Sequence, residues 1–129
     1  MVATTKLTFT MLQDLLINLN NQGGFSVTVL TDHNGFPIAS SARNGSDSDT
    51  QAAVVSQVRK VAGQVRDQLG MAAAEEFSMN DVNGKKLICR SFPIGDQEYI
   101  LAILIPNRDK SYRRLTTLTI RAIQNSWDA

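Results

Sequence analysis

One segment of the chain is apolar without interruption, whereas the other apolar segments are periodic. Residues 99–106 read Tyr-Ile-Leu-Ala-Ile-Leu-Ile-Pro, with three isoleucines before the proline. A strand that is apolar at every position suits burial on both faces, whereas a half-buried strand alternates. The run is also too short to span a bilayer, which takes roughly 20 helical residues. We therefore expect residues 99–106 to be the central strand of a sheet covered on both sides.

Apolar residues at helical spacing predict three helices. The first begins at the candidate N-cap Thr8 and ends at Gly23-Gly24, the second covers residues 51–69, and the third covers residues 110–127. Apolar stripes of this kind pack on a sheet, so we expect each stripe to face the core. The stripe of the second helix is narrow and consists of Val54, Val55, Val58, Val61, Ala62, Val65 and Leu69.

Four more segments predict strands that form two hairpins. They cover residues 25–31, 36–41, 76–82 and 85–92. The turns are Asn34-Gly35 and Asn83-Gly84, and Asn-Gly favours a two-residue hairpin loop because both residues tolerate positive φ. Pro37 lacks a backbone donor and places its strand at a sheet edge. A polar loop after residue 42 leads to Asp49 or Thr50, either of which can cap the second helix.

These elements predict an α/β sandwich with a five-stranded antiparallel sheet. If the last strand is central, the first strand must pair beside it, which gives the order 2-1-5-4-3 with helices on both faces. The third strand is polar and lies at the second edge, where it can pair with another chain. The length of 129 residues is typical of one domain, so we treat residues 1–129 as a single domain with a core of about 7–127.

Small residues recur on a second face of the predicted second helix. Ala52, Ser56, Gly63 and Gly70 are spaced by about one or two turns, among charged residues. A glycine inside a solvated helix costs about 1 kcal/mol relative to alanine. Two interpretations stay open: a tolerated Gly63 with a helix-ending Gly70, or a helix–helix contact between subunits that needs close approach.

Charge and cysteine content exclude several classes of protein. The net charge of +1 provides no field that attracts nucleic acid or an acidic membrane. The one cysteine, Cys89, rules out an internal disulfide framework and fits a reducing compartment. No secretory leader pattern or membrane-length apolar stretch is present, so we expect a cytoplasmic protein without membrane insertion.

Residues suited to catalysis or metal binding are sparse. His33 is the one histidine and lies in a predicted turn, without a second histidine or a cysteine nearby in the sequence. Cys89 falls on a strand, where a small buried residue is the better interpretation than a nucleophile. Neither a phosphate-binding glycine loop nor a nucleophile elbow occurs. We expect no enzyme, no metal site and no cofactor.

The first predicted hairpin carries a family resemblance. Residues 27–41 contain a strand ending in Asp, a turn glycine and then Phe-Pro-Ile-Ala-Ser, which resembles the opening hairpin of the roadblock (dynein light chain) family. The helices and the second hairpin also stand where that family has them, so the resemblance covers about residues 7–127. Its motifs are structural, and profilin-like and longin domains share parts of the layout.

The resemblance implies a non-catalytic domain, similar to the bacterial gliding-motility regulator of a GTPase. Such domains homodimerise through the second helix and third strand and regulate small Ras-like GTPases, or serve as subunits of motor and signalling complexes. The implied dimer contact comprises Ala52, Ser56, Arg59, Gly63, Arg66, Gly70, Phe77, Ser78, Met79 and Asn80. The candidate contacts to a partner are Gln57, Lys60, Gln64 and Asp67.

Three functions therefore compete at the level of sequence. The preferred one is a homodimeric adaptor that binds a small Ras-like GTPase and modulates its GTPase cycle. The second is a structural scaffold subunit of a signalling or motor complex. The third is a sensor of small ligands, for which no cluster of convergent polar residues is visible in the sequence.

Overall fold

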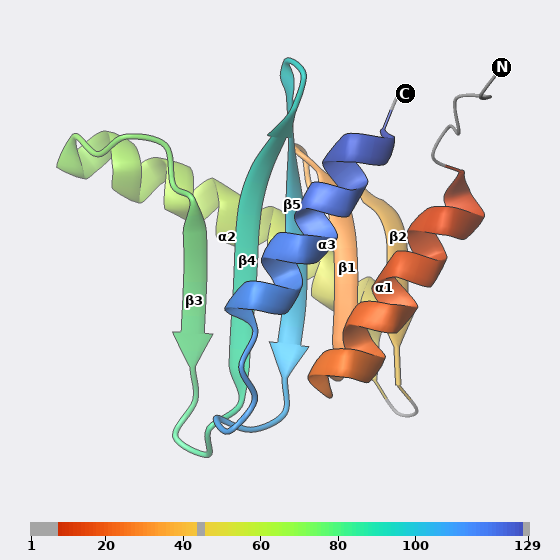
Figure 1. Ribbon diagram of the computed structural model, residues 1–129. Helices are drawn as coiled ribbons and strands as arrows, with labels where there is room; N and C mark the ends of the chain where they lie inside the picture. Colours follow the sequence, from red (N-terminus) through yellow and green to blue (C-terminus); the bar gives the residue numbers. More distant parts are fainter. Residues whose placement is uncertain (1–7, 44–45, 128–129) are drawn as a thin grey trace, which may run out of the picture.

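A computed structural model describes residues 8–43 and 46–127, which form one antiparallel sheet and three helices. The strand order is β2-β1-β5-β4-β3, as the sequence predicts. Helices α1 and α3 cover one face of the sheet, and α2 crosses the other face (Figure 1). The elements are α1 (Phe9–Gly23), β1 (Val27–Asp32), β2 (Pro37–Ala42), α2 (Ser48–Leu69), β3 (Glu76–Asn80), β4 (Lys86–Ile94), β5 (Gln97–Ile105) and α3 (Arg113–Ser126).

Strand β5 is the buried centre of the sheet, which confirms the prediction from the apolar run. It pairs with β1 on one side and with β4 on the other. Leu101 and Ile103 belong to the core under α1 and α3, whereas Ile100 and Ala102 pack with Val55 of α2. Alternate residues of β5 therefore contact two separate helical layers, α1 with α3 on one face and α2 on the other.

Helix α1 begins and ends where the sequence predicts. The Thr8 hydroxyl accepts a hydrogen bond from the Met11 backbone N–H at 3.2 Å, and Gly24 ends the helix with φ +68°. Phe9, an apolar residue in the first turn, is exposed. Ile17 is exposed as well.

Both hairpin loops have three residues rather than the expected two. In the first, the Asp32 N–H donates to the Phe36 carbonyl at 3.0 Å, and the Asp32 carboxylate accepts from the Asn34 and Phe36 N–H groups. Asp81 makes the same bonds in the second loop. In each loop, the carboxylate accepts hydrogen bonds from backbone N–H groups that would otherwise pair between the two strands. Strand β3 therefore ends at Asn80, just before Asp81, and not at Val82.

The amino-terminal half of α2 is fixed to the sheet. Its N-cap is Asp47, not Asp49 or Thr50, and the Asp47 carboxylate accepts from both of their N–H groups. The hydrogen bonds from Thr50 hold the pKa of Asp47 below its ordinary value. The buried Gln51 side chain donates to the Ala102 carbonyl of β5 at 3.1 Å and to a β1 carbonyl.

The carboxy-terminal half of α2 projects beyond β3, the edge of the sheet (Figure 1). The buried residues of α2 all lie in its first eight positions, between Gln51 and Val55. Val61 and Val65 are 50% and 43% exposed, although the sequence assigns them to the core. The expected core-facing stripe is therefore wrong for most of its length, because the helix is longer than the sheet is wide.

Helix α3 closes the other face, starting at Arg113 rather than at Lys110. Ile120 and Ile123 are buried against the sheet, and the ring of Trp127 lies 4.9 Å from that of Tyr99, centre to centre. Leu118, an apolar residue of the same helix, is exposed. The α1/α3 face is thus fully covered near the sheet centre, in contrast to the α2 face.

Candidate functional site

Helix α2 carries two different flanks, one on each side of its contact with the sheet. The valine row is Val54, Val58, Val61 and Val65, and the small-residue row is Ala52, Ser56, Gly63 and Gly70. At about 100° per residue, the two rows lie roughly 165° apart around the helix. The Ser56 hydroxyl donates to the Asn34 carbonyl at 3.4 Å, and Arg59 Nη2 lies 3.9 Å from Glu98 Oε2. The small-residue row therefore faces the sheet end that holds the β1–β2 and β4–β5 turns, and the valine row faces the other end.

Exposed apolar side chains gather on the valine side of α2. The same face of the sheet presents Met79, which is 58% exposed, opposite the half-buried Leu87 in the β3–β4 register. Scattered exposed apolar residues are normal, whereas a cluster marks an interaction site. We name this surface the valine flank, consisting of Val54, Val58, Val61, Val65, Met79 and Leu87.

The outer edge of β3 is open beside the valine flank. Among the strands that the structure describes, β3 pairs with β4 alone. Three of its five residues, Ser78 to Asn80, are exposed. A sheet edge of this kind presents unpaired N–H and C=O groups to a further strand.

The face of α2 that points away from the sheet is polar. It carries the four residues that the sequence nominates for partner contacts: Gln57, Lys60, Gln64 and Asp67. All four are exposed, and they lie on the side of the helix opposite the sheet-facing Val55. A partner can reach them without displacing any part of the fold.

The structure brings some of the nominated dimer residues together and separates others: Arg59, Gly63, Arg66 and Phe77 line one cleft. Ala52 is 4% exposed and packs with Val27 and Val29 of its own sheet, so it is not available to a second chain. Gly70 ends α2 with φ +66°. Around Gly63 the space is open, since an added Cβ would meet nothing within 4 Å. On the strand, Phe77 and Met79 point to the α2 side, where the valine flank lies.

The small-residue row borders a cleft of about 130 Å³ between α2 and the sheet. Strands β3, β4 and β5 form its floor, and the segment after α2 closes one side. The charged residues that line this cleft come from parts of the chain that are far apart in sequence: Arg59, Arg66, Glu76 and Glu98. Sequence reasoning missed the cleft because no local pattern brings a helix arginine to a strand glutamate.

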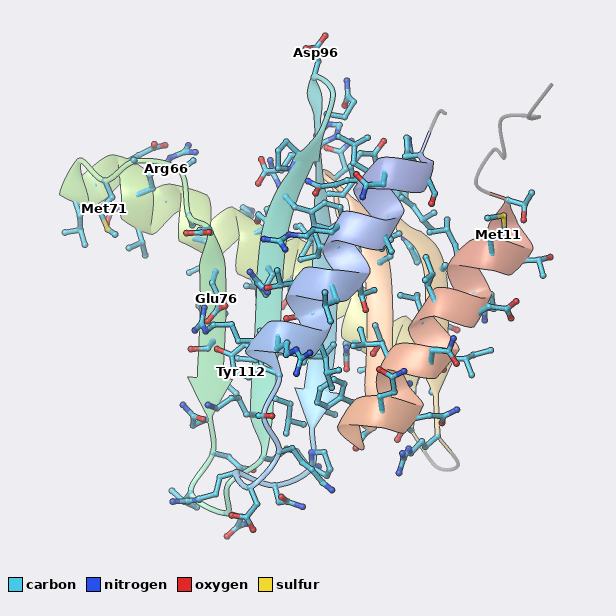
Figure 2. All side chains as sticks on the ribbon, in the orientation of Figure 1. Met11, Arg66, Met71, Glu76, Asp96 and Tyr112 are labelled. Carbon is cyan, nitrogen blue, oxygen red and sulfur yellow. The ribbon has the colours of Figure 1, made fainter. Side chains whose placement is uncertain are left out.

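A polar cluster ties the edge strand to α3 on the opposite face. The Tyr112 hydroxyl donates to Glu76 Oε2 at 2.8 Å, and the two side chains lie next to each other in Figure 2. Arg90 Nε stands 3.7 Å from Glu76 Oε1 while its Nη1 donates to Thr116 Oγ1 at 2.8 Å. Burial and the Glu76 carboxylate raise the pKa of Tyr112, so its hydroxyl keeps the proton that it donates. The cluster positions β3 and leaves its edge open.

Groups suited to catalysis stay apart in the structure. Burial raises the pKa of the Cys89 thiol to about 12, which keeps it protonated. His33 lies in the β1–β2 turn, as expected. Across residues 8–43 and 46–127, no three metal-binding side chains gather in one place. No described helix has the length and apolar character that crossing a membrane requires.

Comparisons with known proteins identify the fold. The family model described as Roadblock/LC7 domain matches residues 11–104. Myxococcus xanthus MglB superposes with a TM-score of 0.70 at 17% identity, covering 97% of this chain and 90% of that one. The gliding protein MglB from Thermus thermophilus gives 0.70 at 14% identity, with 98% and 97% covered. A Roadblock/LC7 domain from Streptomyces avermitilis gives 0.66 at 13%, with 88% and 94% covered. A search of curated proteins finds no match.

Proposed function

Because the chain belongs to the Roadblock/LC7 domain family, we propose that it is a homodimeric adaptor that binds a small Ras-like GTPase and modulates its GTPase cycle. Family membership and the fold shared with MglB support a regulatory role over a catalytic one. The protonated, buried Cys89 and the isolated His33 provide no reactive group that would argue otherwise.

The observation that carries the proposal is the valine flank beside the open edge of β3. Val61, Val65 and Met79 are about half exposed in the single chain. Removing this apolar surface from water favours association. A second copy of the chain can cover the valine flank and pair with the edge of β3 at the same time. This would bury the apolar side chains and supply hydrogen-bond partners for the unpaired backbone N–H and C=O groups of β3.

A two-fold axis beside β3 fits both requirements. Two copies of β3 would pair antiparallel and join two five-stranded sheets into one, since β3 ends each sheet. The projecting half of each α2 would then lie under the sheet of its partner, against the valine flank. This arrangement uses the second helix and third strand, as the family resemblance implies, but on the valine side of the helix.

The polar faces of the two α2 helices would form the platform for the GTPase. Gln57, Lys60, Gln64 and Asp67 point away from the sheet, and pairing through the valine flank leaves them exposed. They offer hydrogen bonds and charges of both signs, which suits a partner that must bind and leave. A structural scaffold subunit would use the same dimer, so only the effect on GTP turnover separates the two functions.

The test is a turnover assay with a small Ras-like GTPase from the same organism. We expect the protein to bind this GTPase and to change its rate of GTP hydrolysis or nucleotide exchange. Lys60→Glu is expected to weaken binding about fivefold or more, in line with a loss of about 1 kcal/mol at a polar contact. Arg114→Glu on the outer face of α3 is the control with the same charge change. If the protein neither binds the GTPase nor changes its rate, the role of structural scaffold subunit is the one that remains.

A further inference from the structure

We propose that the cleft between α2 and the sheet binds a small organic carboxylate with a compact apolar body. This goes beyond the proposed function, because the cleft opens on the Arg59 and Arg66 side of α2 and shares only Val58 with the valine flank. The cleft lies where α2 begins to leave the sheet, and Arg66 stands on the part of the helix that projects past β3 (Figure 2).

The floor of the cleft is apolar. Val55, Cys89 and Ile100 form it and are almost fully buried, while Phe77 and Val58 are half-buried beside them. Small residues on the walls keep the space open. They are Ala62, Gly63, Ala73 and Ala74. The small-residue row of α2 thus has a role in the single chain: it leaves room between helix and strands.

Two guanidinium groups and one carboxylate stand at the rim of the cleft. Arg59 and Arg66 contribute two guanidinium groups, and Glu98 contributes one carboxylate. Glu76 also borders the cleft, but its carboxylate is held by Tyr112 on the α1/α3 side. The balance of two positive groups against one negative group favours an anionic ligand.

Neither arginine is fully engaged. The closest approach of Arg59 to Glu98 is 3.9 Å, with the side chains 41% and 43% exposed, and an ion pair of this kind contributes little. Arg66 donates from Nε to its neighbour Asp67 at 3.1 Å, which leaves the other guanidinium donors available. Both can therefore turn toward a ligand at small cost.

The shape and chemistry select a carboxylate. A planar guanidinium matches a carboxylate with two parallel hydrogen bonds, and the Ser91 residue lining the cleft offers a hydroxyl. The remaining wall accepts hydrocarbon or an aromatic ring. A cleft of about 130 Å³ suits a ligand the size of a small carboxylic acid, well below a nucleotide or a cofactor.

The experiment is a titration of the full-length, isotope-labelled protein, followed by amide chemical shifts. The probes are phenylacetate and hexanoate, and the matched neutral probes are phenylacetamide and hexanamide. We expect saturable shifts at Arg59, Gly63 and Ser91 with at least one carboxylate, and about tenfold weaker binding of its amide because the charged hydrogen bonds are lost.

Three variants locate the site. Arg59→Gln is expected to weaken carboxylate binding about tenfold, since it removes the guanidinium. Gly63→Leu fills the open space and abolishes binding, whereas Gly63→Ala adds one carbon and keeps it. Arg121→Gln on α3 leaves binding unchanged. The proposal is overturned if neither acid gives saturable shifts, if the amides bind equally well, or if the shifts lie away from the cleft.

Discussion

Gly35 and Gly84 occupy the same position in two loops of the same design, yet their surroundings differ. Both have positive φ, +87° and +92°. This backbone conformation costs a residue that carries a side chain about 1–2 kcal/mol. A Cβ at Gly35 would lie 2.6 Å from Ser56 Cβ and 2.8 Å from its Cα. At Gly84 the nearest atom is the flexible Arg108 side chain, 3.0 Å away. Gly35 therefore serves the packing of α2 as well as the turn.

This difference predicts unequal effects of the same substitution. Gly84→Ala is expected to lower the free energy of unfolding by about 1–2 kcal/mol, the cost of the backbone conformation alone. Gly35→Ala is expected to cost at least about 1 kcal/mol more, because the backbone of Ser56 cannot move aside without shifting α2. Urea unfolding of the two variants measures both. Equal destabilisation would mean that the turn does not support α2.

At the scale of elements, α2 is a helix with two functions divided along its length. Its first half is held by Asp47 at the cap and by Gln51 on two strand carbonyls. Its second half has apolar side chains without a covering layer. Such a helix is stable only where it is anchored, and the projecting half gains from a partner.

The anchor can be tested with a pair of isosteric substitutions. Gln51→Met keeps the size of the side chain but loses both hydrogen bonds to the sheet, so the free energy of unfolding should fall by about 1–2 kcal/mol. Gln57→Met on the exposed polar face is the control and should change it by less than about 0.5 kcal/mol. Chemical denaturation reports both values. If Gln51→Met were as stable as the control, packing of Val55 alone would hold the helix.

At the scale of the molecule, the sequence predicts the sheet but not the surfaces of α2. The run at residues 99–106 indicates the centre of the sheet because it is apolar at every position, and Pro37 indicates one edge because it lacks a backbone donor. The valine row looks like a core stripe until the width of the sheet is known. The cleft likewise depends on where α2 leaves the sheet, which no local pattern encodes.

The central claim is that two copies meet through the valine flank, and the oligomeric state tests it directly. Sedimentation of the wild-type protein should give twice the chain mass of 14.1 kDa, and Val65→Glu should give the single-chain mass. Gly63→Glu, which directs the same charge into the cleft, should remain a dimer. The claim is contradicted by a wild-type monomer or by a dimer that survives Val65→Glu.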